Sequence, residues 1–325
     1  MSSSTSPIIL FYQTTTKDVY IYFGSTLLIT GIIGELLNLI IFQTLRVFRE
    51  SPGVFYLRIM SLSNIGQILV AVLFRTLNYG FQINLLRSSW ICKMREFLVH
   101  FCALVSLTSI CLATVDQYLS LTRPNLSQMK YSYRHGVIMI VLWLLHNVPF
   151  LIYCDMVSGS CRNSSTTFST YANYFIWPVL LGCLPVAIML IFAILSYISV
   201  RRISKAQINT TRLSHERQIT SMVLVYVVFI IVLSLPCILY SIYALNPPYT
   251  DTESTARGRL IYGLLSFFYY ESYACSFYIY CCVSKRFRKQ LLYVLFEVHL
   301  KRWRKAFGQL QQNQVGIQQI TSTTN

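Results

Sequence analysis

Charged residues are scarce in this sequence: they make up 12% of the 325 residues, whereas hydrophobic residues make up 54%. A soluble globular domain carries about 25% charged residues, because its surface faces water. The scarcity of charge therefore excludes an ordinary soluble fold and favours lipid as the solvent. Acidic residues are the scarcest, with 11 against 27 lysines and arginines and a net charge of +16.

The sequence also lacks several functional signatures. It contains no H-E-x-x-H and no G-x-S-x-G motif, so zinc-peptidase and serine-hydrolase chemistry lack their residues. We therefore expect no enzyme, no bound metal and no cofactor. No inverted repeat or pair of Gly/Pro-broken helices is visible, which argues against a transporter or channel. Residues 1–18 lack the basic segment and short apolar core of a cleavable signal peptide, so the first apolar run is expected to direct insertion.

What the chain does have is seven apolar stretches, each close to the ~20 residues that a helix needs to cross the hydrocarbon. They cover residues 19–42, 55–79, 92–119, 136–154, 171–197, 219–244 and 260–282. The second carries Arg58 and Arg75 near its ends, where long side chains extend toward the headgroups. The predicted fold class is an all-α membrane protein, a seven-transmembrane helix bundle in one domain.

Basic residues lie between the apolar stretches and are distributed unequally. The segments after the first, third, fifth and seventh stretches hold 18 lysines and arginines, and the opposite side holds seven. The positive side is cytosolic, which predicts an extracellular N-terminus and a cytosolic C-terminus. This pattern explains the net charge by topology, so we expect no nucleic-acid binding.

Beyond the last stretch, basic residues alternate with apolar ones at helical spacing, as in Phe287, Leu291 and Leu295. This predicts an amphipathic helix that lies in the inner interface and contacts membrane lipids. The expected organisation is an extracellular tail (1–18), a transmembrane domain with its interfacial helix (19–298) and a cytosolic tail (299–325).

The third stretch carries the most specific motif. Cys92 stands at its outer end, Asp116-Gln117-Tyr118 at its inner end, and Pro124 follows. This resembles the third helix of rhodopsin-like (class A) G-protein-coupled receptors, in which a cysteine opens the helix, D-R-Y closes it and a proline follows. The other features that resemble the family lie in register along the chain: Gly34, Asn38, Trp143, Pro149, Pro185, Pro236, Tyr280 and Phe287.

Five positions depart from the family pattern. Gln117 replaces the arginine of D-R-Y, Asn64 replaces the aspartate of the second helix, and Ser276-Phe277 replaces the N-P of the seventh. Ser234 stands in place of the tryptophan that precedes the sixth-helix proline. The lost aspartate weakens any bound-sodium site, although Ser106 remains where a partner would lie. These departures affect the expected switching mechanism more than the fold.

The resemblance implies a plasma-membrane receptor that binds an extracellular ligand and signals to heterotrimeric G proteins. Alternatives are a transporter or channel, and a receptor-like scaffold that does not signal. The positions implied for G-protein coupling are Asp116, Gln117, Tyr118, Glu216 and Tyr280; those for helix packing are Asn38, Asn64, Ser106, Trp143, Pro185 and Pro236; those for the ligand are Arg95, Val99, His100, Ala103, Tyr269 and Tyr270. Amine receptors carry aspartate where this chain has Val99, so a biogenic amine is not expected.

The resemblance also implies a disulfide from Cys92 to the second outer loop, with Cys161 as the favoured partner and Cys154 as the alternative. Of three N-x-S/T sequons, only the one at Asn163 faces outward under the predicted topology. Cys281 and Cys282 are either palmitoylated or simply packed. Within the spans, Glu35 and Glu271 either bind a cation or proton, or are neutral and hydrogen-bonded.

Overall fold

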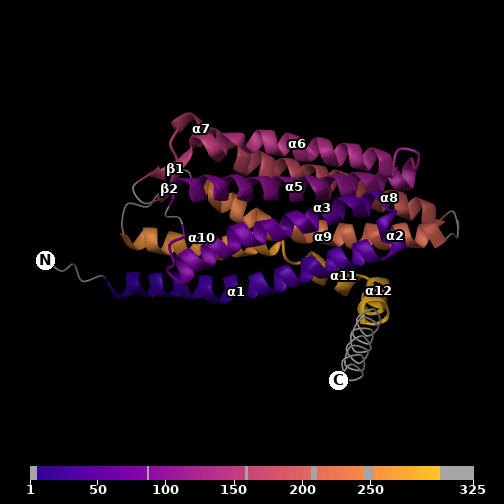
Figure 1. The fold of residues 1–325 in the computed structure, drawn as a ribbon, viewed down its shortest axis with the longest axis horizontal. Coiled ribbons are helices and arrows are strands. Elements are labelled where there is room, and N and C mark those ends of the chain that lie inside the picture. Colours follow the sequence, from indigo (N-terminus) through magenta and orange to yellow (C-terminus); the bar gives the residue numbers. More distant parts are fainter. Residues whose placement is uncertain (1–5, 86–87, 158–159, 206–210, 245–251, 301–325) are drawn as a thin grey trace, which may run out of the picture.

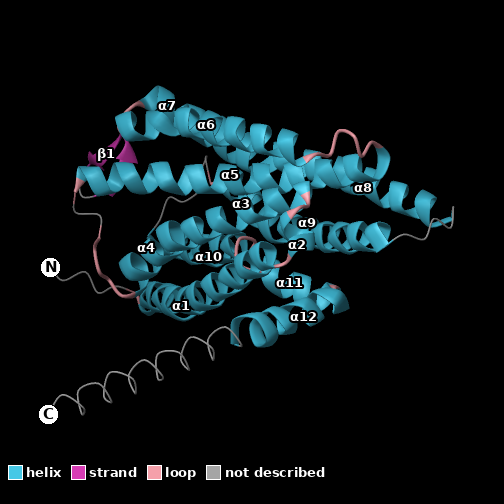
Figure 2. Ribbon diagram, turned by 45° about the vertical axis from the view of Figure 1, so that its right-hand side comes forward, coloured by secondary structure: helices cyan, strands magenta, loops and turns pink. Residues whose placement is uncertain are grey.

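The computed structural model describes residues 6–85, 88–157, 160–205, 211–244 and 252–300, and these residues are almost entirely helical (Figure 2). Its elements follow in chain order: α1 (Pro7–Thr44), α2 (Arg46–Arg49), α3 (Pro52–Gln67), η1 (Ile68–Val72), α4 (Leu73–Arg75), η2 (Thr76–Gly80), α5 (Ser89–Thr122), α6 (Met129–Tyr153), β1 (Cys154–Val157), β2 (Ser160–Asn163), α7 (Thr166–Tyr171), η3 (Ala172–Cys183), α8 (Leu184–Lys205), α9 (Thr211–Tyr243), α10 (Thr252–Glu271), α11 (Ser276–Val283), α12 (Lys285–Leu292) and η4 (Tyr293–Leu300). Elements labelled η are π-helical.

The long helices run side by side in a bundle (Figure 1). The antiparallel β1–β2 hairpin lies at one end and α12 at the other, and we call these the hairpin end and the α12 end. Six helices in the described part of the chain are long and apolar enough to cross a membrane, and they match the first six predicted spans. The seventh predicted span, 260–282, is built from α10 and α11.

The first helix is longer than its predicted span. It begins at Pro7, after an N-cap in which the Ser6 hydroxyl accepts a hydrogen bond from the Ile9 N–H. Proline is favoured at the first helical position because its missing N–H would have no partner there. The apolar composition that set the predicted boundary at residue 19 carries no information about this cap, so α1 extends into the segment predicted as a tail.

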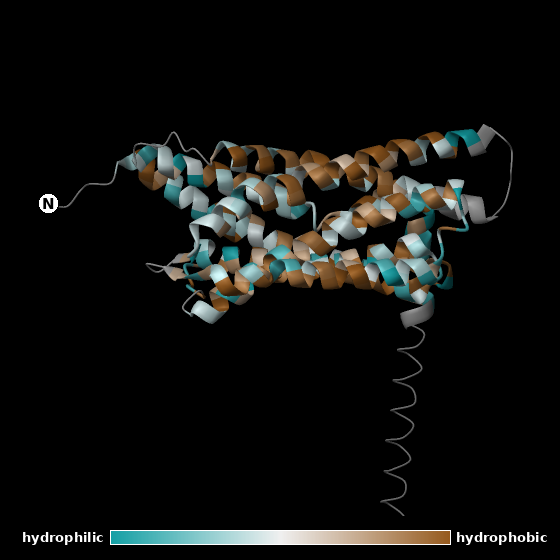
Figure 3. Ribbon diagram, turned by 90° about the horizontal axis from the view of Figure 1, so that it is seen from above, coloured by the Kyte–Doolittle hydropathy of each residue, from teal (hydrophilic) through white to brown (hydrophobic). Residues whose placement is uncertain are grey.

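Helix α5 occupies the centre of the bundle, where it contacts α3, α6, α8 and α9 (Figure 1). By contrast, α6 exposes a row of large apolar side chains at helical spacing, namely Val137, Val141 and Leu145. Exposed apolar surface on that scale is unfavourable in water and is expected against lipid. Hydrophobic residues accordingly line the middle of the helices, and hydrophilic ones gather toward the two ends (Figure 3).

Helix α1 packs closely against the seventh segment because glycine stands at the contact. A Cβ atom added to Gly31 would lie 2.9 Å from the Ala274 Cβ atom and 2.8 Å from Ile68. Small residues permit such close approach of helices in membranes. This contact holds the middle of α1 beside the junction of α10 and α11.

That junction is a break at residues 272–275, between Glu271 and Ser276. No proline causes it. Instead, the Tyr226 hydroxyl of α9 donates a 2.9 Å hydrogen bond to the Ser272 carbonyl oxygen, and the Ser272 hydroxyl donates to the Tyr269 carbonyl. Side chains that satisfy backbone carbonyls in this way stabilise a helix interruption without proline.

Two further irregularities frame the bundle. The fifth predicted span begins as the π-helix η3, which contains Pro178 and ends just before Pro185. At the α12 end, the Ser284 hydroxyl caps α12, and Phe287 is fully buried against Phe42 and Tyr280. The predicted interfacial helix is therefore present over Lys285–Leu292.

Candidate functional site

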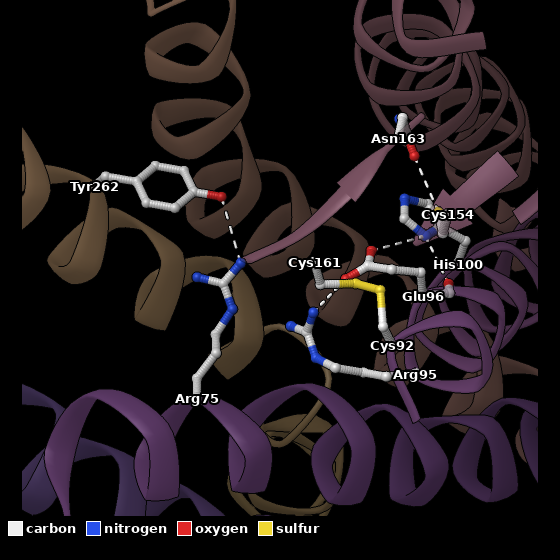
Figure 4. A network of polar contacts seen from close by, with 9 residues as sticks. All are labelled: Arg75, Cys92, Arg95, Glu96, His100, Cys154, Cys161, Asn163 and Tyr262. Atoms are coloured by element: carbon white, nitrogen blue, oxygen red, sulfur yellow. Dashed lines mark hydrogen bonds and ion pairs between the residues drawn. A yellow bond between two sulfur atoms is a disulfide. The ribbon is translucent and has the colours of Figure 1, made fainter. Parts of the chain in front are cut away.

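The hairpin covers the end of α5 and is joined to it covalently. Cys92 and Cys161 form a disulfide with a Cα–Cα distance of 5.6 Å (Figure 4). The alternative partner, Cys154, is a free thiol whose Sγ donates to the Asn163 Oδ1 atom at 3.0 Å. The structure thus confirms Cys92–Cys161 over the alternative.

Noncovalent contacts fix the same hairpin. Lys93 of α5 lies 4.0 Å from Asp155 of β1. A hydrogen bond from Ser89 and another from the Met156 N–H hold the pKa of the exposed Asp155 carboxyl below its ordinary value. Asn163, the predicted glycosylation site, is half-buried in β2 with its side-chain oxygen bonded to Cys154.

A buried polar cluster occupies the middle of the bundle, and Glu35 of α1 is its centre. The Glu35 Oε1 atom accepts hydrogen bonds from Asn64 of α3 at 2.9 Å and from Ser276 of α11 at 2.7 Å. The Asn38 side-chain amide donates to Ser276 at 2.7 Å, and Ser106 of α5 donates to the Asn64 Oδ1 atom at 2.5 Å. All five side chains are essentially inaccessible to solvent. We call these five residues the Glu35 cluster.

The Glu35 cluster joins α1, α3, α5 and α11 through side chains that the sequence placed on separate spans. Two of its members, Asn64 and Ser276, occupy positions at which the chain departs from the family pattern. The carboxyl group that the family pattern has on the second helix is therefore supplied in this chain by Glu35 of the first helix. Glu271, the other intramembrane acid, is half-buried at the end of α10 and lies outside this cluster.

At the α12 end, Gln117 links α5 to α9. Its Oε1 atom accepts a 3.0 Å hydrogen bond from the Thr220 hydroxyl, and both residues are 2% exposed. The neighbouring Asp116 accepts a hydrogen bond from Ser127 at 2.8 Å. Glu216, another position that the resemblance implies for G-protein coupling, has its side chain outside the described residues. Sequence reasoning did not identify Thr220.

Gln117 also faces α3 through a gap left by glycine. A Cβ atom at Gly53 would lie 2.5 Å from the Gln117 Nε2 atom and 3.2 Å from the Asp116 Oδ2 atom. Within the described residues, the Nε2 atom is buried without a hydrogen-bond partner. The amide is thus only half satisfied in this conformation.

Aromatic residues surround the same end. Tyr280 is fully buried and packs edge-on against Tyr226 and Phe287 at ring-centroid distances of 5.8 Å. Tyr118 is half-buried and lies 5.9 Å from the ring of Phe192 on α8. Residues 226 and 280 thereby connect α9 to the region just below the α10–α11 break.

The predicted packing residues make specific contacts. The Trp143 indole N–H donates a 3.0 Å hydrogen bond to the Thr108 hydroxyl, which joins α6 to α5. The Pro185 carbonyl oxygen accepts from the Cys111 thiol at 3.7 Å, which joins α8 to α5. Pro236 lies inside α9, the predicted sixth span.

Near the hairpin end, the predicted ligand-binding residues of α5 are mostly packed. Val99, His100 and Ala103 are 6%, 4% and 1% exposed. The His100 Nδ1 atom lies 2.8 Å from the Glu96 carbonyl oxygen, and the ring stacks on Phe150 at 4.0 Å. Arg95 forms an ion pair with the adjacent Glu96 (Figure 4).

A cavity of about 220 Å³ lies beside these residues, between η3, α9 and α10. Its lining is Asn173, Trp177, Pro178, Cys237, Ile238, Ser241, Ile242, Ala244, Tyr262 and Tyr269. Of the predicted ligand-binding residues, only Tyr269 lines it; Tyr270 is buried beside Tyr269 with ring centroids 5.5 Å apart. Protein pockets for small ligands are mostly apolar with a few polar groups, as this one is.

Arg75 borders the cavity through Tyr262, to whose hydroxyl it donates a 3.4 Å hydrogen bond (Figure 4). The sequence predicts a side chain that extends to the headgroups. In the structure, its guanidinium lies between the rings of Tyr262 and Tyr270, 5.5 and 5.4 Å from their centroids. The presence of a cation inside an apolar span was the only signal that could have identified it.

The model of the seven-transmembrane receptors of the rhodopsin family matches residues 36–287, more than three quarters of the chain. This chain belongs to the rhodopsin family. A comparison with curated proteins finds no matching sequence. The match runs from residue 36 in α1 to residue 287 in α12, so the seven-helix membrane fold is confirmed, and the broken α10–α11 segment is the seventh helix of the family. Members of this family are multi-pass membrane receptors that signal across the bilayer, and they are not enzymes.

Proposed function

We propose that this receptor binds an extracellular ligand at the hairpin end and activates a heterotrimeric G protein at the α12 end. The N-terminus lies outside the cell and the C-terminus in the cytosol, with the receptor in the plasma membrane. The excess of lysine and arginine in the segments at the α12 end supports this orientation. The transporter and scaffold alternatives are addressed by the experiment below.

The observation that carries the proposal is the Gln117–Thr220 hydrogen bond. It joins α5 to α9 at the end where a G protein would bind. We take the helix bundle to have a resting and an active state, and a ligand shifts that equilibrium only by binding one state better than the other. In this chain the contact is between neutral groups, which makes it about half as strong as a charge-assisted one. We therefore expect the Gln117–Thr220 hydrogen bond to stabilise the resting state only weakly.

The test is nucleotide exchange on purified G proteins by the receptor in lipid nanodiscs. Thr220→Val removes the hydroxyl donor while keeping the shape of the side chain, and Thr220→Ser retains the hydroxyl as the matched control. A neutral hydrogen bond contributes about 1 kcal/mol, so basal exchange should rise by about fivefold in the valine variant and stay unchanged in the serine variant.

Two results would contradict the proposal. If neither wild type nor Thr220→Val accelerates exchange on any heterotrimer tested, the receptor-like scaffold becomes the better account. If both variants change exchange equally, the Thr220 hydroxyl does not hold the resting state. Uptake of solute by proteoliposomes that contain the wild-type protein would instead favour the transporter.

A further inference from the structure

Arg75 is a cation for which the described part of the chain supplies no carboxylate partner. No aspartate or glutamate side chain of the described residues lies within 4.0 Å of it; the ion pairs found there involve Arg46, Lys93, Arg95 and His100. Its Nε atom is buried and has no hydrogen-bond partner among those residues. A charge removed from water is costly unless it is paired, and a cation inside a span marks a functional site by default.

The surroundings of Arg75 hold it in place but do not neutralise it. The guanidinium lies over the rings of Tyr262 and Tyr270, and Tyr20 of α1 also interacts with it. Cation–π contacts of this kind stabilise a cation and leave its full positive charge in place. The tyrosines thus position the guanidinium with its charge available.

A second guanidinium, that of Arg95, lies near Tyr270 but is already paired. Tyr270 interacts electrostatically with both Arg75 and Arg95, and Arg95 forms its ion pair with Glu96. Figure 4 shows Arg75 beside Tyr262 and Arg95 below the Cys92–Cys161 disulfide. Of these two guanidinium groups, that of Arg75 therefore has no carboxylate partner among the described residues.

Arg75 adjoins the cavity through Tyr262. The Tyr262 side chain lines the cavity, and its hydroxyl accepts a hydrogen bond from Arg75. Beyond these residues its walls are chiefly apolar, with Trp177, Ile238 and Ile242 among them. The arrangement places a cation that no described carboxylate compensates one residue away from a small apolar space.

We propose that the cavity binds a small carboxylic acid whose carboxylate pairs with Arg75 and whose apolar part lies between η3, α9 and α10. This inference rests on the proposed receptor function and names the class of its ligand. A guanidinium matches a carboxylate in charge and in planar geometry. One uncompensated positive charge balances a singly charged carboxylate, whereas a phosphate monoester brings nearly two negative charges at neutral pH.

The test is ligand-dependent thermal stabilisation of the full-length receptor in lipid nanodiscs at neutral pH. The probes are octanoate, octanamide, octylamine and octyl phosphate, which share one apolar chain and differ in the head group. A ligand that binds only the folded state raises the unfolding midpoint in proportion to its affinity. We expect octanoate to stabilise the wild-type receptor most.

The variants separate the charge from the cavity. Arg75→Gln should weaken octanoate binding by about tenfold or more, because a charge-assisted hydrogen bond contributes about 1.5–3 kcal/mol. Arg75→Lys should retain part of the affinity. Arg201→Gln is the matched control, since Arg201 also lies over a tyrosine ring, that of Tyr197 at 5.3 Å, but at the α12 end. Ser241→Phe should fill the cavity and abolish binding while Arg75 is intact.

Equal stabilisation by octanoate and octanamide, or unchanged octanoate affinity in Arg75→Gln, would overturn the inference. A lack of stabilisation by all four probes would overturn it as well. Stronger stabilisation by octyl phosphate than by octanoate would show that the ligand class is a phosphate and not a carboxylic acid. Basal nucleotide exchange by the same nanodiscs reports on the proposed function separately. Exchange without octanoate binding refutes only the ligand class, and octanoate binding without exchange refutes only the G-protein coupling.

Discussion

The carboxylate of the Glu35 cluster should function equally well from the neighbouring helix. Glu35 and Asn64 are joined by a 2.9 Å hydrogen bond from the asparagine amide to the carboxylate. The double variant Glu35→Gln/Asn64→Asp exchanges the amide and the carboxylate between α1 and α3. The amide then donates from α1 to the carboxylate on α3, and Ser106 still has an oxygen at position 64 to which it donates. We therefore predict that the double variant retains the hydrogen bond between residues 35 and 64, with donor and acceptor exchanged between the two helices.

The single variants should each be less stable than the pair. Glu35→Ala leaves the Asn64 amide and the Ser276 hydroxyl without their acceptor, and each unsatisfied buried donor costs about 1–3 kcal/mol, so the loss is about 2–6 kcal/mol. Asn64→Asp alone places two carboxyl groups in contact, which cannot both be charged at that separation. Glu35→Gln alone retains the acceptor oxygen and should lose about 1 kcal/mol.

The measurement is the unfolding midpoint of the four proteins in the cycle, in lipid nanodiscs: wild type, Glu35→Gln, Asn64→Asp and the double variant. Contacting residues show interaction energies of about 0.5–3 kcal/mol in such a cycle, and we expect the double variant to recover most of the loss of Asn64→Asp. Strictly additive losses would refute the reasoning, because they would mean that residues 35 and 64 do not depend on each other. Glu271→Gln, a change outside the cluster, is the matched control. Added to each of the four proteins, it should leave the interaction energy between residues 35 and 64 unchanged.

Two further predictions concern topology and the outer loop. An N-terminal epitope tag should bind antibody on intact cells and a C-terminal tag only after permeabilisation; access to both tags on intact cells would contradict the orientation. Cys161→Ser should lower surface expression because it frees the hairpin from α5, whereas Cys154→Ser removes only a thiol hydrogen bond and should have little effect. Equal expression of both variants, with Cys92 alkylatable in wild type, would show that the disulfide is not required.

The sequence was sufficient for those features that depend on composition along the chain. Apolar length located the seven spans, and the spacing from Cys92 to Gln117 placed the third helix in its family. The disulfide partner followed from the family pattern and is confirmed at Cys161. These features are predictable although the chain departs from the family pattern, because they depend on membrane thickness and on the outer end of the third helix.

The features that depend on which helix faces meet were not predictable from one sequence. Ser276 and Glu35 are 241 residues apart, and nothing local indicates that their side chains bond. The break at residues 272–275 has no proline and depends on the Tyr226 hydroxyl from another helix. From the sequence, Arg75 is interpreted as a residue at the end of a span that extends to the headgroups. The structure shows that its guanidinium lies over the rings of Tyr262 and Tyr270.

Gln117→Arg tests the central claim, signalling through the α5–α9 contact, most directly. The arginine restores the charge that family members carry, beside Asp116 and in the space that Gly53 leaves open. Gln117→Met, which has neither charge nor amide, is the control for side-chain size and for the lost hydrogen bond to Thr220. The measurement is the rate of G-protein nucleotide exchange at equal amounts of receptor. We predict a larger gain in exchange over wild type for Gln117→Arg than for Gln117→Met, which loses only the hydrogen bond to Thr220 and should match Thr220→Val. A wild-type receptor that already drives exchange at full rate, with Gln117→Arg neutral or inhibitory, would contradict the account.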